Sequence, residues 1–157
     1  VMPNFTQFGW AVTKAPQDLL AELQQALHHG FDTAVPEFDD PAIVGHPLMV
    51  DLPDHLREKA LIELQPYFEA WIGGISLRPE NAYGLRIYPD RSSLYMHTDK
   101  HSTHVISGIF HIDHSEDSEP WPLVIEDFEG VTQKVVLQKG DVLLYESAKC
   151  LHGRPMP

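Results

Sequence analysis

Residues 139–154 read Lys-Gly-Asp-Val-Leu-Leu-Tyr-Glu-Ser-Ala-Lys-Cys-Leu-His-Gly-Arg. A Gly-Asp turn at 140–141 comes directly before the apolar run 142–145, which is typical of a buried β-strand. A second short strand is expected over residues 151–154, after the polar stretch 146–150. Two short strands this close together indicate antiparallel β-structure, and His152 lies within the second of them.

Short β-rich runs also precede this stretch, from about residue 82 onward. They alternate with turn residues such as the Pro-Asp-Arg-Ser segment 89–92 and the polar loop 114–120. Such alternation is typical of a sandwich or a barrel. The predicted strands cover residues 83–88, 103–112, 123–127, 131–137, 141–145 and 151–154.

The first half of the chain shows helical periodicity instead. Leucines at positions 19, 20, 23 and 27 predict an amphipathic helix over residues 16–29. A second helix is expected from Pro53 to Gly73, with a kink or a break at Pro66, and residues 31–51 between the helices look irregular. The predicted fold class is therefore α+β, mainly β: a double-stranded β-helix (jelly roll) with N-terminal supporting helices.

The chain has 157 residues, which is enough for one domain with one buried core. We expect a single domain over residues 1–157, with a helical support region over 1–81 and the jelly-roll core over 82–157. The last β-rich run is interrupted at Pro157. Because a jelly roll without its closing strand would expose a sheet edge, a final strand is expected beyond this chain.

Composition excludes several classes of function. The net charge of −12 opposes binding to nucleic acid or to an anionic membrane surface. No apolar run approaches the roughly 20 residues that a membrane span needs. The first residues carry no pattern of a secretion signal, and the single cysteine, Cys150, rules out an intramolecular disulfide. These features predict a cytoplasmic protein without nucleic-acid or membrane partners.

Histidine is the unusual component, with ten residues in the chain and five of them between positions 97 and 114. Two His-x-Asp pairs occur, at His97/Asp99 and His111/Asp113, although about one such pair is expected by chance. Residues i and i+2 of a strand point to the same side, so either pair could hold a metal ion. Two histidines and one carboxylate form the facial triad of iron(II) oxygenases, and His152 is the best candidate for the third ligand.

The order of these segments is specific. Residues 83–157 resemble the core of the prolyl 4-hydroxylase-like iron(II)/2-oxoglutarate-dependent oxygenases. The pieces that carry the resemblance are, in order, Leu85-Arg86-Ile87-Tyr88, His97-Thr98-Asp99, the strand-like run 104–111, the Gly-Asp turn with its apolar strand at 140–145, and His152-Gly153.

The resemblance implies roles for five residues. His97, Asp99 and His152 would bind iron, Tyr88 would hydrogen-bond 2-oxoglutarate, and His111 would reach the same cosubstrate from inside the barrel. In this family a basic residue binds the distal carboxylate of 2-oxoglutarate. That residue follows the distal histidine by more positions than this chain has after His152. Arg154 is the only basic residue after His152. It could substitute for that residue or hold substrate, or the partner could lie in a segment absent here, which is the interpretation that we favour.

The implied activity is hydroxylation of a C–H bond by dioxygen, with release of succinate and carbon dioxide. The substrate is a small molecule or a peptide, and the sequence is silent on which, as it is on the oligomeric state. Two alternatives stay open. One is a cupin-like metal enzyme that does not use 2-oxoglutarate, and the other is a non-catalytic jelly-roll module that binds sugars or peptides.

Overall fold

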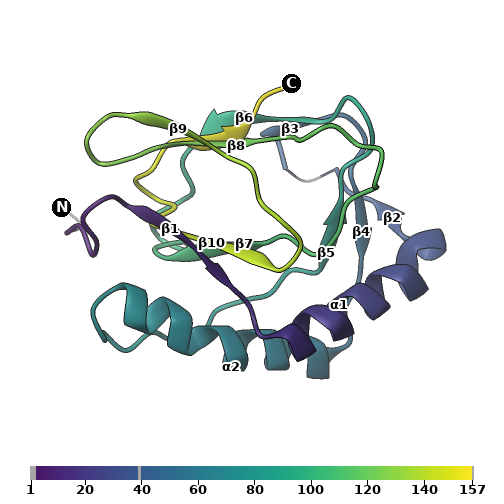
Figure 1. The fold of residues 1–157 in the computed structure, drawn as a ribbon, viewed down its shortest axis with the longest axis horizontal. Coiled ribbons are helices and arrows are strands. Elements are labelled where there is room, and N and C mark those ends of the chain that lie inside the picture. The colour runs from purple at the N-terminus through teal and green to yellow at the C-terminus, as the bar shows by residue number, and fades with distance from the viewer. Residues whose placement is uncertain (1–2, 39, 157) are drawn as a thin grey trace.

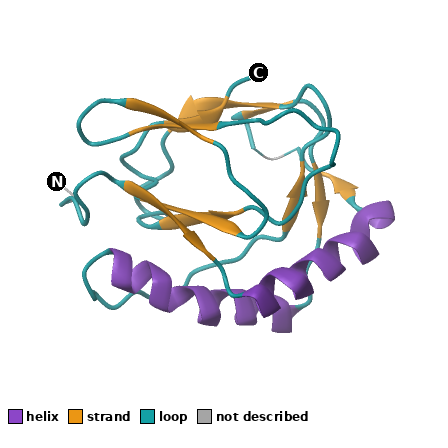
Figure 2. Cartoon of the chain, in the orientation of Figure 1, coloured by secondary structure: helices purple, strands orange, loops and turns teal. Residues whose placement is uncertain are grey.

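The computed structural model describes residues 3–38 and 40–156. Two long helices lie below a stack of short strands, as Figure 1 and Figure 2 show. The helices are α1 (Gln17–Gly30) and α2 (Asp54–Trp71), and a short 3-10 turn, Phe31–Thr33, follows α1. The strands are β1 (Trp10–Lys14), β2 (Val35–Pro36), β3 (Ile43–Val44), β4 (Leu48–Val50), β5 (Leu85–Ile87), β6 (Ser93–His97), β7 (Ser107–Phe110), β8 (Leu123–Glu126), β9 (Thr132–Val135), β10 (Asp141–Tyr145) and β11 (His152–Arg154).

The strands form three sheets in which every described pairing is antiparallel. A five-stranded sheet has the order β3-β6-β11-β8-β9, and a three-stranded sheet has the order β1-β10-β7. These two sheets face each other in Figure 1, and the third sheet, β2-β4-β5, lies at one end. The architecture is thus mainly antiparallel β-structure with two helices, while the closer assignment to a jelly roll stays a prediction.

Strand β10 contributes side chains to two hydrophobic clusters, one on each of its faces. All five of its residues are buried, because it is the central strand of its sheet and both of its faces are covered. Leu143 and Tyr145 point between the sheets, where Leu123 and Ile125 of β8 pack against them. On the opposite face, Val142 and Leu144 pack against side chains of α2, namely Leu64, Phe68 and Trp71.

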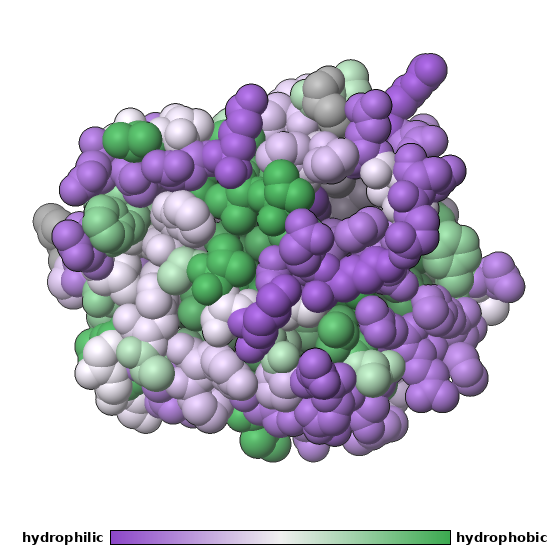
Figure 3. Space-filling model, in the orientation of Figure 1, coloured by the Kyte–Doolittle hydropathy of each residue, from purple (hydrophilic) through white to green (hydrophobic). Residues whose placement is uncertain are grey.

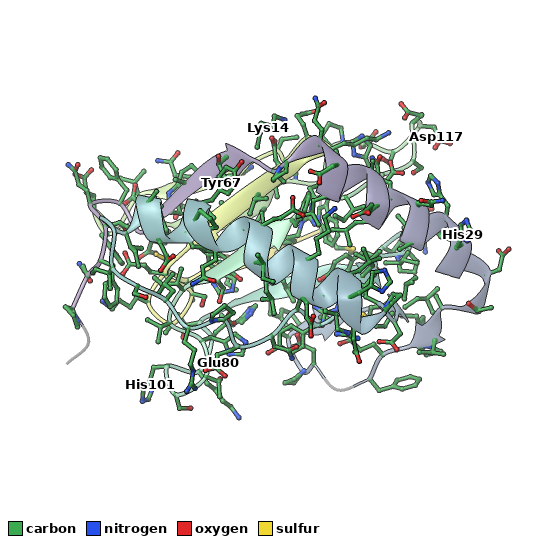
Figure 4. All side chains as sticks on the ribbon, turned by 90° about the horizontal axis from the view of Figure 1, so that it is seen from below. Lys14, His29, Tyr67, Glu80, His101 and Asp117 are labelled. Carbon is green, nitrogen blue, oxygen red and sulfur yellow. The ribbon has the colours of Figure 1, made fainter. Side chains whose placement is uncertain are left out.

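Helix α2 therefore covers the outer face of the β1-β10-β7 sheet, whereas α1 packs against α2 and against β4 and β5. Figure 4, seen from below, shows α2 passing in front of these strands, with Tyr67 of α2 beside the sheet and α1 running alongside α2. Gly108 of β7 makes this close approach possible, because a Cβ there would lie 2.4 Å from the ring of Phe68. Hydrophobic side chains also reach the surface between the sheets, on the face shown in Figure 3.

Most predicted elements are present, with several differences. Helix α2 continues through Pro66 to Trp71, so a break at Pro66 is wrong, whereas a kink there stays a prediction; the turn after Pro66 packs on β10 through Phe68 and Trp71. Strand β1 was not predicted, and residues 31–51 contain three short strands instead of an irregular segment. These strands are too short to show a periodicity, and they form through pairing with distant segments.

The segment around His97 differs as well. The predicted strand 103–112 is reduced to β7, and a turn region separates it from His97. His97 is instead the last residue of β6, a strand that was not predicted from the sequence.

The predicted closing strand after Pro157 lies outside the described residues and stays a prediction. Within those residues, β5 pairs only with β4, and β7 pairs only with β10. No helix in the described part of the chain is both long enough and apolar enough to cross a membrane.

Candidate metal centre

Two histidines face each other across neighbouring strands. His152 of β11 is the direct register partner of His97 at the end of β6, although 54 intervening residues separate them in the chain. Directly opposed residues of an antiparallel pair point to the same side of the sheet, and the two imidazole centroids are 4.5 Å apart. Pairing of β6 with β11 is thus the event that creates the site.

Asp99 completes a cluster of three. Its backbone N–H donates to the carbonyl oxygen of Ser147 at 2.9 Å, which fixes the chain two residues beyond β6. Its Oδ1 lies 3.4 Å from Nε2 of His97 and 3.6 Å from Nε2 of His152. One ligand atom from each residue lies within 4.8 Å of the other two, so a single ion could contact all three.

Backbone carbonyls set the tautomer of both imidazoles. Nδ1 of His97 lies 2.7 Å from the carbonyl oxygen of Tyr95, and Nδ1 of His152 lies 2.8 Å from that of Cys150. A carbonyl oxygen can only accept, so each Nδ1 must carry the proton and donate it. The lone pair of each Nε2 is then free and directed at the space beside Asp99, which is how metal-binding histidines are held.

The charge state also suits a divalent cation. Burial tends to raise the pKa of Asp99, but its interactions with His152, His104 and His97 lower it by more, so the pKa of this carboxyl lies below its ordinary range. His152 is only 2% exposed, whereas His97 and Asp99 are partly accessible. One anionic oxygen and two neutral nitrogens on one side, with an accessible opposite side, fit an ion such as iron(II).

Gly153 allows β11 to lie this close to β6. The register passes from His152 opposite His97 to Arg154 opposite Leu94, so β6 carries an extra residue in a bulge. A Cβ at Gly153 would lie between 2.8 and 3.0 Å from backbone atoms of β6. The glycine therefore keeps His152 and Arg154 on the same inward side while the strands remain in contact.

Arg154 lies beside this centre in an unusual environment. Its guanidinium carbon is 4.2 Å from the ring centroid of Trp121, and Nη2 donates to the carbonyl oxygen of the same residue at 2.8 Å. Its Nε is buried and has no partner among the described residues. Burial lowers the pKa of Arg154 and Tyr88 opposes that shift, so the tyrosine lies within electrostatic reach of the guanidinium.

Tyr88 and Trp121 form an aromatic pair beside Arg154. Their rings meet edge to face with centroids 5.2 Å apart, and Nε1 of Trp121 donates to the carbonyl oxygen of Pro155 at 2.9 Å. Arg86 directs one N–H toward the Tyr88 hydroxyl at 3.4 Å and forms a bidentate ion pair with Glu37 at 2.6 Å. Of these two arginines, Arg86 is thus neutralised by a carboxylate, whereas the buried Nε of Arg154 has no partner among the described residues.

His111 lies on the same side of the fold as Arg154. Burial lowers the pKa of His111 to about 4, and the charges of Arg154 and His114 add to this shift. Its Nε2 is 2.9 Å from Nδ1 of His114. The residue is therefore neutral at pH 7 and is already engaged with its neighbour. Among the described residues, the second His-x-Asp pair does not form a three-ligand cluster: Asp113 forms an ion pair with Lys139 and lies 3.3 Å from Nε2 of His28.

A solved structure has a similar fold over nearly the whole of this chain. The chain superposes on the crystal structure of a prolyl 4-hydroxylase from Pseudomonas putida with a TM-score of 0.71, over 96% of this chain and 86% of that one. The fold is prolyl 4-hydroxylase-like. The two sequences are 16% identical, so the likeness concerns the fold. No family model matches the sequence, and no curated protein matches it either.

Several residues around the site escaped sequence reasoning. The carbonyl groups that orient the cluster belong to Tyr95, Ser147 and Cys150, and a carbonyl leaves no signal in the residue type. Cys150 itself is 1% exposed and packs in the core between the sheets, as a small buried apolar residue would. Tyr145 is also buried, with its ring edge against His152 at 4.7 Å; burial and the nearby Asp99 raise its pKa.

Proposed function

We propose that this protein is an iron(II)- and 2-oxoglutarate-dependent oxygenase that hydroxylates a C–H bond. The observation that carries the proposal is the cluster of His97, Asp99 and His152, whose potential ligand atoms lie within 4.8 Å of one another on a prolyl 4-hydroxylase-like fold. Two imidazoles and one carboxylate are the donor set typical of iron(II) oxygenases.

When bound, iron(II) would supply the coordination of 2-oxoglutarate and the activation of dioxygen that lead to succinate, carbon dioxide and a hydroxylated product. The protein provides the geometry for this chemistry. His97 and His152 offer neutral Nε2 atoms, because their Nδ1 protons are held by carbonyl oxygens. Asp99 offers a negative charge, which leaves the bound ion with a net positive charge toward an anionic chelator.

Arg154 and Tyr88 are the residues that we propose for the cosubstrate. A buried guanidinium with an unused Nε–H lacks an acceptor, and a carboxylate is the acceptor that matches it best. Arg154 lies two residues from His152 on the same side of β11, so it can reach a ligand that chelates the metal. This environment supports Arg154 as the partner of the distal carboxylate, in preference to a residue in an absent segment.

Tyr88 would assist as a hydrogen-bond donor. Its hydroxyl oxygen lies near an N–H of Arg86, which leaves the hydroxyl proton free for a carboxylate oxygen. His111, neutral and paired with His114, would form part of the pocket wall without adding charge.

The substrate is proposed at the level of class. The name of the Pseudomonas putida enzyme makes a prolyl residue one candidate, and other peptide side chains and small molecules remain candidates beside it. The net charge of −12 disfavours nucleic acid as a partner.

Anaerobic titration tests the proposal. Iron(II) and 2-oxoglutarate are added to the protein, and the weak visible charge-transfer band of the iron chelate is expected. Asp99→Asn should abolish the band, whereas Asp113→Asn, a matched change in the second His-x-Asp pair, should retain it. Iron binding without a band would favour the cupin-like alternative, and no iron binding would favour the binding module; either result refutes the oxygenase proposal.

A further inference from the structure

Residues 146–150, in the loop that joins β10 to β11, position two of the three candidate ligands. The carbonyl oxygen of Ser147 accepts the backbone N–H of Asp99 at 2.9 Å, and that of Cys150 accepts the Nδ1 proton of His152 at 2.8 Å. The hydroxyl groups of Ser147 and Ser107 form a further hydrogen bond at 2.6 Å. The position of this loop therefore determines both the place of Asp99 and the rotation of the His152 imidazole.

The first residue of the loop is a buried carboxylate that the proposed chemistry does not use. Glu146 is 1% exposed. Its Oε1 accepts the N–H of Phe5 at 2.9 Å, and its Oε2 accepts both the N–H of Thr6 at 3.1 Å and the hydroxyl of Thr6 at 2.6 Å. Within the described part of the chain, the cation paired with it is Nζ of Lys149, 3.9 Å from Oε1. A buried carboxylate requires such donors, and all three come from one short segment at the other end of the sequence.

This segment, residues 5–9, is here called the N-terminal strap. It continues along the loop, since the carbonyl oxygen of Gly9 accepts the N–H of Glu146 at 2.9 Å. The contact is close, because a Cβ at Gly9 would lie 2.5 Å from Sγ of Cys150. Figure 1 shows the chain before β1 beside the connection from β10 to β11, although the two have opposite ends of the colour range.

We propose that Glu146 is a positioning residue for the metal centre: its carboxylate fastens the N-terminal strap across loop 146–150 and so holds the carbonyls that orient Asp99 and His152. The inference rests on the proposed metal centre. It assigns a role in metal geometry to a carboxylate that touches neither the metal ligands nor the cosubstrate pocket, and to a strap that lies more than 130 residues away in the sequence.

The test uses Co(II) as the probe, because its visible absorption reports both affinity and ligand geometry. Glu146→Gln replaces one acceptor oxygen by an NH2 group that faces an N–H donor of the strap. We expect Co(II) to bind about 10-fold more weakly and its absorption spectrum to change, as is typical when an outer partner of a ligand is lost. Thr6→Val removes the hydroxyl from the same cluster and should act in the same direction with a smaller effect.

Two controls separate positioning from general destabilisation. Thr6→Ser keeps the hydroxyl, and Glu129→Gln removes an exposed carboxylate; both should show the Co(II) affinity and spectrum of the wild type. All titrations are made well below the melting temperature of each variant. If Glu146→Gln does not fold, Thr6→Val decides by the same criteria.

The outcomes distinguish this inference from the proposed function. If the wild type binds Co(II) and a folded Glu146→Gln or Thr6→Val variant binds it within twofold with an unchanged spectrum, the positioning role is wrong and the metal centre stands. If the wild type does not bind Co(II), the metal centre is wrong and the inference falls with it.

Discussion

The tight contact at Gly153 yields the sharpest prediction for the fold of the site. A Cβ added by Gly153→Ala would lie 2.8 Å from the carbonyl oxygen of Leu94, 2.9 Å from that of Tyr95 and 3.0 Å from Cα of Met96. All three are backbone atoms of β6, so no side chain can rotate away. To restore ordinary contact, β11 must move from β6 by about half an ångström, and the two strands carry His152 and His97.

The displacement sets the expected magnitudes. Forcing an extra methyl group into a packed position costs about 1–3 kcal/mol in the free energy of unfolding. A metal site tolerates about 0.5 Å of ligand displacement before its geometry fails, so Co(II) affinity should fall at least about 10-fold. Urea denaturation measures the first quantity, and titration followed by visible absorption measures the second.

Gly130→Ala is the matched control. Gly130 has φ +79° with open space around it, so alanine there costs about 1 kcal/mol of backbone strain without any contact near the site. It should lower stability and leave Co(II) affinity unchanged. If Gly153→Ala binds Co(II) as tightly as the wild type, the close contact of β11 with β6 does not control the site and our reasoning is refuted.

Three further predictions follow from particular residues. Arg154→Gln should raise the 2-oxoglutarate concentration that half-saturates the anaerobic charge-transfer band by about 10- to 100-fold, since a charge-assisted hydrogen bond contributes about 1.5–3 kcal/mol. The affinity for Co(II) should not change. An unchanged half-saturation concentration would show that Arg154 does not bind the cosubstrate. The pKa of His111 falls from an ordinary 6.5 to about 4 on folding, so the unfolded chain binds more protons in this interval and stability should decrease as pH falls from 6.5 toward 4. Urea denaturation at pH 7 and pH 5 should show a smaller decrease for His111→Gln, and an identical decrease would contradict the assignment. Leu143→Ala removes a fully buried side chain between the sheets and should cost about 2–5 kcal/mol in thermal or urea denaturation, whereas a loss below about 1 kcal/mol would argue against this core.

Much of the fold follows from local patterns in the sequence. The leucine spacing of α1 and the Gly-Asp turn before β10 each predict their element within a residue or two. Strands β1 and β6 escaped prediction, because their form depends on partners far along the chain. β1 pairs residue for residue with β10, about 130 positions away, and no local periodicity encodes such a partner.

The candidate site was likewise predicted in part from the sequence and in part only from the structure. The order of His97, Asp99 and His152 among β-rich runs, together with the family resemblance, singled out the three residues that the structure brings together. The same reasoning favoured a carboxylate partner outside the chain, whereas the buried Nε of Arg154 supports a partner within it. Whether the Arg154 guanidinium is buried, and whether a carboxylate of the described residues pairs with it, depends on the surrounding structure and cannot be read from the residue type.

The sequence by itself thus determined a mainly β fold with helices in its first half, and with the family resemblance it predicted His97, Asp99 and His152 as ligands, because turn residues, apolar runs and ligand types are local properties. Only the tertiary structure decided that β6 and β11 pair so that His97 faces His152, that Asp113 is engaged by Lys139 and His28, and that Glu146 binds the N-terminal strap. The physical reason is that contacts between segments 26 to 140 residues apart depend on how whole sheets pack, and packing is a property of the complete fold.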